Sequence, residues 1–208
     1  MDYLITESTY GNRLHPPNED VKSELADMIL KIAVERGKLI IPAFSSGRTQ
    51  TIVFFLNQLY HEGRIPEVPV FVDSPLSTRA TEVFSKHDDC FDEETLRLMM
   101  DDTKPFTFRT LHYITDVEES KSLNKMDGPM VIISASGMCE SGRILHHLAN
   151  NIGSRHNIIL ITGFQAENTL GRRLVEGISP VRIFGDEYEV MAEVKVINAL
   201  SAHADRNE

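Results

Sequence analysis

The chain has 208 residues, of which 41% are apolar, and its 21 basic and 31 acidic side chains give a formal net charge of −10. This composition allows a sizeable core and lacks the bias of disordered or fibrous proteins. The negative charge argues against a basic coat for nucleic acid, so any polyanion must be met at local sites. No apolar run approaches the length of a membrane span, and the N-terminus resembles neither a signal nor a transit peptide. We expect a cytoplasmic protein that does not contact the membrane.

The predicted strands and helices alternate along most of the chain. A helix begins at an Asn18 cap and ends at Gly37, with Val21, Leu25 and Ile32 among the apolar side chains that share one face. The unbroken apolar strands that follow are typical of a parallel sheet buried on both faces. In chain order, the other expected elements are a strand at 38–44, a helix ending near 63, a strand at 69–72, two solvated acidic helices within 82–102, a strand at 130–133, a helix at 144–152, a strand at 157–162 and a helix around 170–175.

This order predicts an α/β fold with a mainly parallel, Rossmann-like sheet, helices on both faces and right-handed crossovers. In such sheets, ligands bind beyond the carboxyl ends of the strands. The tail follows a different pattern, because the runs 182–184 and 190–196 flank Gly185 and Asp186, and the second run alternates apolar with charged residues. We predict a hairpin with one solvent-exposed face there.

Three polar turns at the carboxyl edge are candidate phosphate sites. The turn 134–138 runs straight from a strand into a helix, where backbone N–H groups and the positive helix end can hold a phosphate oxygen. The turn 45–48 adds the guanidinium of Arg48, which suits a bidentate grip on phosphate, and 169–173 supplies a third turn. The alternative is that these are only tight turns and that the arginines pair with surface carboxylates.

A carboxylate and an imidazole lie near opposite ends of the chain. Glu7 follows the β-type run 2–6, and His203 follows the run 190–200, so each is expected at a strand end. Such a pair can perform acid/base chemistry, because the anion fixes the tautomer of the ring and raises its proton affinity. By itself, a histidine near a strand end is more often a structural or surface residue.

Other catalytic signatures are absent from the sequence. It has no Walker lysine, HExxH or GxSxG motif, which disfavours an ATPase, a zincin and an α/β-hydrolase. His146 and His147 are adjacent in a predicted helix, where neighbouring side chains diverge. We expect one on the surface and one in the core, rather than two metal ligands.

Seven motifs follow one another along nearly the whole chain. They are Glu7–Gly11, Phe44–Gln50, Asp73–Leu76, Ile133–Met138, Gly163–Ala166, Thr169–Arg172 and Ser201–Asp205. Together they resemble the β-CASP branch of the metallo-β-lactamase-fold nucleases. The stretch 163–172 is closest to the RNA-cleaving side, similar to the cleavage and polyadenylation specificity factor endonucleases and their bacterial and archaeal relatives.

The resemblance implies roles for individual residues. Glu7 would be the acidic residue that opens the β-CASP domain, and His203, oriented by it, would protonate the leaving oxygen of a cleaved phosphodiester. Asn168 stands where many relatives have glycine, which is expected to reshape that turn. The residues implied to face the backbone of single-stranded RNA are Ser45, Ser46, Gly47, Arg48, Ser134, Ser136, Gly137, Met138, Gln165, Thr169 and Arg172.

The resemblance also implies a cofactor for which this chain lacks the ligands. Such enzymes hold two zinc ions through HxHxDH and further His and Asp residues, and none of these motifs occurs here. We therefore expect residues 1–11 and 197–208 to be strand stubs of a missing metallo-β-lactamase domain and residues 12–196 to be the β-CASP domain. A fragment of this kind is expected to bind no metal and to be inactive alone.

The expected parent is a zinc-dependent ribonuclease whose active-site cleft this segment clamps, cleaving RNA as an endonuclease, a 5′ exonuclease or both. Its expected partners are RNA, the metallo-β-lactamase domain and, as an open alternative, a second copy in a homodimer. Two other functions stay open: a non-catalytic RNA-binding subunit of a processing complex, and a DNA-processing nuclease of the same fold. The presence of both Glu7 and His203 disfavours the non-catalytic subunit.

Overall fold

The computed structural model describes residues 3, 5–12, 14, 18–93, 95–96, 104–197, 200 and 203–207. Their main feature is a six-stranded sheet of order β3-β2-β4-β1-β5-β8, with parallel pairing throughout. The strands are β1 (Lys38–Pro42), β2 (Val70–Asp73), β3 (Leu111–Ile114), β4 (Met130–Ser134), β5 (Ile158–Ile161) and β8 (Glu193–Val196). This confirms the predicted α/β fold with a mainly parallel sheet.

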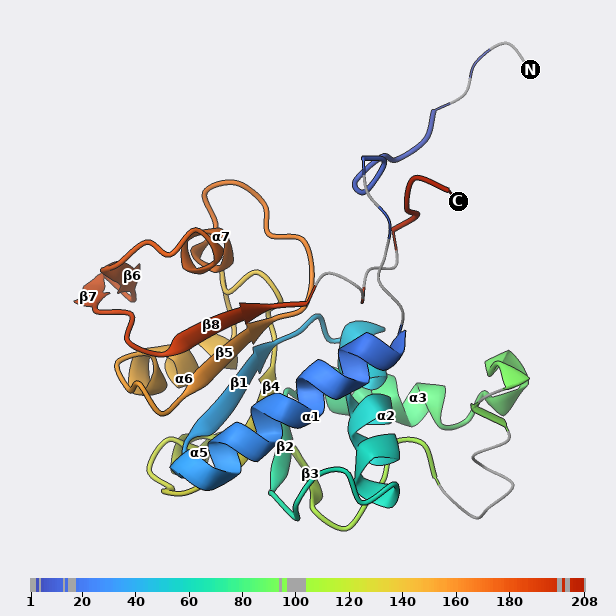
Figure 1. The fold of residues 1–208 in the computed structure, drawn as a ribbon, viewed down its shortest axis with the longest axis horizontal. Helices are drawn as coiled ribbons and strands as arrows, with labels where there is room; N and C mark the ends of the chain where they lie inside the picture. The colour runs from blue at the N-terminus through green and yellow to red at the C-terminus, as the bar shows by residue number, and fades with distance from the viewer. Residues whose placement is uncertain are drawn as a thin grey trace.

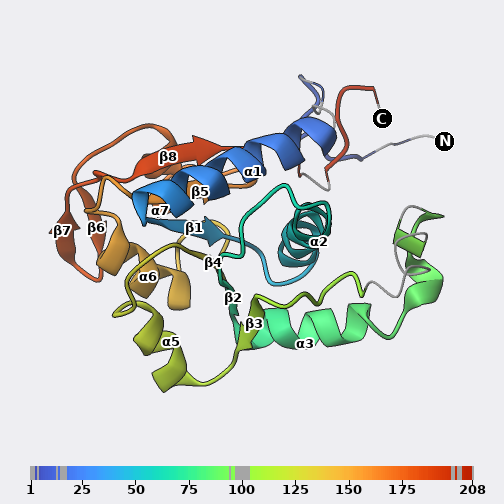
Figure 2. The same cartoon turned by 60° about the horizontal axis from the view of Figure 1, so that its bottom comes forward.

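Helices cover both faces of the sheet (Figures 1 and 2). The first face packs against α1 and α2, and the second against α5, α6 and α7. The helices are α1 (Asn18–Glu35), α2 (Arg48–His61), α3 (Pro75–Phe84), α5 (Val117–Leu123), α6 (Arg143–Asn151) and α7 (Leu170–Val175), with a 3-10 turn, η1 (Asp88–Cys90). In the part of the chain that the structure describes, no helix combines the length and the apolar character needed to cross a membrane.

The central strands divide their side chains between two cores. Leu39 and Ile41 of β1 face the core under α1 and α2, while Ile40, between them, faces the core under α6. Successive side chains of a strand point to opposite faces, so a strand covered on both sides must be apolar at every position. The unbroken apolar runs in the sequence are a direct result of this double burial.

The first helix ends close to the predicted stop, but for a different reason. Helix α1 begins at Asn18 itself and ends at Glu35, and Arg36 takes the left-handed backbone conformation with φ of 54°. Gly37 is fixed by a close approach, because a Cβ at this position would lie 1.7 Å from the carbonyl oxygen of His156. The glycine therefore lets the start of β1 pass against the segment that leads into β5.

The predicted tail hairpin is wrong in its second strand. Strand β6 (Val181–Ile183) pairs in antiparallel fashion with β7 (Asp186–Tyr188), directly across a turn in which Phe184 and Gly185 both have positive φ. The alternating run after it forms β8, which pairs in parallel with β5 at the edge of the main sheet. Alternation reports that one face of a strand meets solvent, and an edge strand satisfies that pattern as well as a hairpin does.

Two further elements differ from the sequence-based expectation. Edge strand β3 was not predicted, because its half-exposed run carries no strong apolar signal.

Helix α3 starts within the expected turn, where the Ser74 hydroxyl accepts the N–H of Ser77 and Pro75 occupies the first turn. Of the predicted acidic helices, the structure describes the end of α3, the exposed η1 and helical backbone at 93 and 95–96, while 94 and 97–103 lie outside the described residues. No strand includes the described residues of the run 2–6.

The two ends of the described chain lie beside each other. Tyr10 and Asp205 form an isolated parallel bridge, and the blue and red terminal segments run together in both Figure 1 and Figure 2. The bridge lies outside the six-stranded sheet. The proposed division into a domain and two strand stubs stays a prediction.

Candidate functional site

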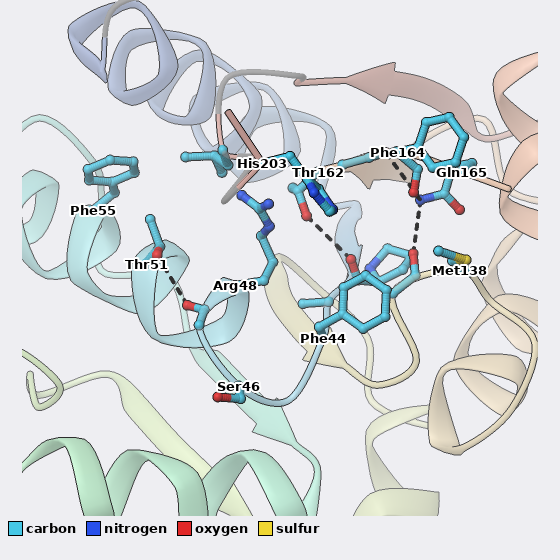
Figure 3. A pocket seen from close by; sticks show the side chains of 16 residues that line it. Phe44, Ser46, Arg48, Thr51, Phe55, Met138, Thr162, Phe164, Gln165 and His203 are labelled. Atoms are coloured by element: carbon cyan, nitrogen blue, oxygen red, sulfur yellow. Dashed lines mark hydrogen bonds between the residues drawn. The ribbon is translucent and has the colours of Figure 1, made fainter. Parts of the chain in front are cut away.

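A pocket of about 470 Å³ lies at the carboxyl edge of the sheet, where the chain leaves β1, β4 and β5. Its walls are the turns after these three strands, the first residues of α2, and His203 from the C-terminal segment. Figure 3 shows Arg48 extending from α2 toward His203, with Phe44 and Phe164 on the side of Met138 and Gln165. Parallel sheets bind ligands at this edge.

The turn between β1 and α2 is held by side chains from the helix that follows. Gly47 has φ of 78°, which favours glycine, and no side chain caps the helix there. The hydroxyl of Thr49 donates to the Phe44 carbonyl at 2.9 Å, and that of Thr51 donates to the Gly47 carbonyl at 3.1 Å. Gln50 Nε2 donates to the carbonyl of Ser45 at 3.2 Å. The turn is thereby fixed from the helix side.

Arg48 supplies a cation to this pocket. Its guanidinium makes no ion pair with a carboxylate among the described residues, and it lies close to the backbone of Gly163. Burial lowers the pKa of Arg48 to about 10, with Tyr10 opposing the shift, so the side chain stays charged at neutral pH. A half-buried cation without a carboxylate partner is suited to bind an anion.

Glu7 and His203 lie together in the structure. Glu7 Oε2 is 3.4 Å from His203 Nδ1, and Glu7 Oε1 accepts the N–H of Ala204 at 3.0 Å. The ring nitrogen of His203 that does not face Glu7 is Nε2. Hydrogen bonds in catalytic pairs are often long in the absence of substrate. The fold therefore places the carboxylate where it can orient the imidazole.

The Glu7 carboxylate is ionised at neutral pH. Hydrogen bonds from the N–H and hydroxyl of Thr9 hold the pKa of Glu7 below its ordinary value, and Ala204 and His203 add smaller contributions in the same direction. The Thr9 N–H lies 2.8 Å from Oε2. An ionised carboxylate on the Nδ1 side of the ring can accept a hydrogen bond from it and fix its orientation.

Hydrogen bonds join the predicted turns after β4 and β5 to each other. Gln165 Nε2 donates to the Gly137 carbonyl at 3.1 Å, and the N–H of Gly171 donates to the Met138 carbonyl at 3.1 Å. The turn after β4 does not run directly into a helix as predicted, because α6 begins only at Arg143. The turn 134–138 therefore lacks the helix N-terminus that its predicted role in binding phosphate required. The hydrogen bonds between the turns after β4 and β5 make this side of the pocket rigid.

Ser134 and Ser136 also make internal contacts. Ser134 is 1% exposed, and its hydroxyl donates to the carbonyl of Asp73 at 2.9 Å. The Ser136 hydroxyl accepts the backbone N–H groups of Glu140 and Ser141 at 3.2 and 3.3 Å. These hydroxyls shape the loop after β4 instead of projecting from it.

Thr169 and Arg172 have structural partners on α7. The Thr169 hydroxyl accepts the N–H of Arg172 at 3.2 Å as a helix cap and donates to the Ala166 carbonyl at 2.8 Å. Arg172 Nε lies 2.7 Å from the exposed Glu176 carboxylate, as the surface-pair alternative requires. Asn168 has φ of 66°, a conformation that asparagine tolerates where many relatives are expected to have glycine.

The sequence-based site residues thus fall into three groups. His203 and six of the predicted RNA-facing residues line the larger pocket: Ser46, Gly47, Arg48, Gly137, Met138 and Gln165. A smaller pocket of about 230 Å³ shares Gln165 and is also lined by Tyr10 and Arg172. The predicted residues that line neither pocket are Glu7, Ser45, Ser134, Ser136 and Thr169.

A buried ionic network next to the site was not predicted. Asp73, fully buried at the end of β2, accepts hydrogen bonds from Ser120 at 2.6 Å and Arg143 at 2.7 Å. The same carboxylate lies 2.6 Å from Nε2 of His147, whose Nδ1 is 2.9 Å from Asn124 Oδ1. His147 is in the core, as expected, and His146 is exposed. The position of Asp73 directly after a buried strand was the available signal.

The described residues do not fit the zinc pair that the resemblance implies. Within the part of the chain that the structure covers, no three His, Cys, Asp or Glu side chains gather into a group that could hold a metal ion.

Comparisons with known proteins agree with the geometry. The profile of the Beta-Casp domain family matches residues 49–174, more than half of the chain. Across its whole length, the chain is 33% identical to a protein of Thermus thermophilus named as a ribonuclease and 32% identical to an RNase J-like protein of Methanocaldococcus jannaschii. It is also 28% identical to the transcription termination factor FttA of Methanosarcina mazei. The chain spans 48%, 47% and 34% of the lengths of these three relatives.

Proposed function

The chain belongs to the Beta-Casp domain family, and from this we propose that it is the RNA-binding clamp domain of a ribonuclease that hydrolyses RNA phosphodiesters. Its relatives include proteins named as ribonucleases, which supports a nuclease role in RNA processing. The activity of the parent, its substrate and its need for a metallo-β-lactamase domain belong to the proposal. So does the inactivity of this segment alone.

The observation that carries the proposal is the meeting of three groups at one pocket. His203, with the Glu7 carboxylate on its Nδ1, lines the same pocket as the charged, half-buried side chain of Arg48. A phosphodiester bound against Arg48 would place its negative charge on the guanidinium. His203 Nε2 would then be near the oxygens of the scissile phosphate.

In the proposed reaction, the chain's own residues handle binding and one proton. Arg48 holds the phosphate, and protonated His203 gives its Nε2 proton to the leaving oxygen as the ester bond breaks. Glu7 keeps the ring oriented and stabilises its charged form before the transfer. The zinc ions implied by the resemblance would supply an activated hydroxide as nucleophile, and residues elsewhere in the parent would have to hold them.

The test uses the full-length parent with a labelled single-stranded RNA. His203→Ala is expected to lower the cleavage rate by roughly 10² to 10⁴, the range for a lost general acid, while the Kd for RNA stays near the wild-type value. His146→Ala is the matched control, because His146 is an exposed histidine on α6 that does not line the pocket.

Three results would contradict the proposal. Equal losses of binding and cleavage in His203→Ala would make His203 a substrate contact instead of an acid. A wild-type parent that binds RNA without cleaving it would be the non-catalytic subunit, and a preference for cleaving DNA of the same sequence would favour the DNA-processing alternative.

A further inference from the structure

Two phenylalanines at the pocket are unusually exposed. Phe44 is 49% exposed and Phe164 is 44% exposed, and both line the larger pocket. The chain has ten phenylalanines, and only Phe184, at the β6–β7 turn, is comparably open. An exposed aromatic ring gives up the stabilisation that burial would provide, so a pair of them at a site indicates a ligand with a matching surface.

Both rings are attached to rigid turns. Phe44 packs against the backbone of Gly137, where an added Cβ would lie only 2.9 Å from the ring. Phe164 is held through Gln165, whose Nε2 donates to the Phe164 carbonyl at 3.1 Å and to the Gly137 carbonyl at 3.1 Å. The turns that carry the rings follow β1 and β5, which are neighbouring strands. The backbone that carries each ring is therefore fixed before any ligand arrives, which reduces the entropic cost of binding.

The charge of the pocket limits how RNA could be held there. The chain carries a net charge of −10, and Arg48 is the one Lys or Arg among the described residues that line the larger pocket. Phosphate contacts alone then provide little affinity, because each gains its free energy from the release of counterions by a cation. Aromatic stacking needs no charge, and every base presents a π face.

We propose that Phe44 and Phe164 form a stacking platform for unpaired nucleobases of the RNA strand whose phosphate is bound by Arg48. This inference rests on the proposed function and specifies its substrate, a single strand recognised without regard to sequence. In the close-up of the site, the Phe44 ring lies between Arg48 and Met138, and the Phe164 ring lies beside Gln165 (Figure 3). A duplex would be a poor ligand, because its bases already stack on one another.

The experiment measures RNA affinity in the full-length parent carrying His203→Ala, so that the RNA stays intact. In this background, Phe44→Leu and Phe164→Leu keep apolar bulk but remove the aromatic plane. Each is expected to raise the Kd for a single-stranded 10-mer by about 5- to 150-fold, the range for one lost base stack. Phe44→Tyr and Phe164→Tyr should restore the affinity, and Phe184→Leu, an exposed ring outside the pocket, should leave it unchanged.

A set of 10-mers, each with one abasic position, separates stacking from a structural effect. If a ring stacks on a base, the losses of affinity caused by removing that base and by removing the ring must be non-additive. The Leu variant should therefore have the same Kd for the abasic 10-mer as for the complete 10-mer. Additive losses at every position would overturn the platform, since the rings would then act only through the shape of the pocket. Thermal unfolding of each variant checks that the fold is intact.

The outcomes also separate this inference from the function on which it rests. If the His203→Ala parent with both rings binds no RNA, the proposed function and the platform fall together. If it binds RNA while both Leu variants bind equally well, the clamp function stands and the platform is wrong. Tighter binding of a duplex than of the single strand would also refute the platform.

Discussion

Replacing Asp73 by asparagine should remove several kcal/mol from the stability of the domain. The carboxylate is fully buried and accepts hydrogen bonds from Ser120, Arg143 and His147 at 2.6 to 2.7 Å. An amide keeps the shape but loses the charge, and it turns one acceptor into a donor that faces these donors. Breaking one partner out of a buried ionic network costs about 3–5 kcal/mol, because the remaining charges stay buried without compensation.

The size of the effect can be translated into a melting temperature. For a domain of this length, 1 kcal/mol corresponds to roughly 2–4 °C, so Asp73→Asn should lower the Tm by about 6–20 °C. Urea denaturation followed by circular dichroism would give the free energy of unfolding directly. Glu187→Gln is the control, because Glu187 pairs with Arg182 in solvent, where an ion pair contributes about 1 kcal/mol or less.

The same network predicts a pH dependence. Burial raises the pKa of Asp73, but the hydrogen bonds from His147, Ser120 and Arg143 together outweigh it, so the folded-state pKa lies below the ordinary value. A depressed carboxyl pKa gives stability that is complete above the unfolded pKa of about 3.9 and is lost as pH falls through the folded pKa. Wild type should therefore lose stability below about pH 4, and Asp73→Asn should lose less. A change of less than about 1 kcal/mol in Asp73→Asn at pH 7, or equal acid sensitivity of both proteins, would refute the reasoning.

Two other substitutions test contacts elsewhere in the fold. Gly37→Ala should destabilise the domain by about 1–3 kcal/mol, because its Cβ would meet the His156 carbonyl at 1.7 Å, whereas Gly153→Ala has open space and should be nearly neutral in urea denaturation. Arg48→Ala should flatten the dependence of log Kd for RNA on log salt concentration by about 0.7, the value for one phosphate on a single strand, and Arg172→Ala should change it less, since Glu176 already neutralises that side chain. Equal slopes for wild type and Arg48→Ala would remove Arg48 from the phosphate site.

The sequence predicted the fold well where burial leaves a pattern along the chain. Runs such as Leu39–Ile41 must be apolar because both faces of the sheet are covered, so parallel strands could be recognised locally. The alternating run of β8 indicates only that one face of the strand is exposed to solvent, and it does not identify β5 as the strand with which β8 pairs. That choice depends on contacts distant in sequence, which local periodicity does not contain.

The site was predicted unevenly for a similar reason. Motif resemblance paired Glu7 with the segment at His203, although the Glu7–Ala204 hydrogen bond joins residues 197 positions apart. It could not separate residues that line the pocket, such as Arg48, from those that only shape the loops around it, such as Ser134 and Ser136. A serine or glutamine in a polar turn has the same sequence signature whether its side chain points outward or donates to a neighbouring carbonyl. Only the three-dimensional arrangement makes that distinction.

The bridge between Tyr10 and Asp205 joins the two terminal segments in the folded domain. The distance between His203 and Glu7 therefore depends on the folding of the residues between these segments. If the intervening chain of about 190 residues were disordered, its ends would meet with an effective concentration on the order of 1 mM. In the folded domain, the imidazole is instead held in contact with its carboxylate. If the proposed function is right, any change that unfolds the sheet, however far from the pocket, would separate His203 from Glu7 and lower cleavage by the parent as temperature rises. The stability of the core would then set the temperature above which the proposed acid is separated from its carboxylate.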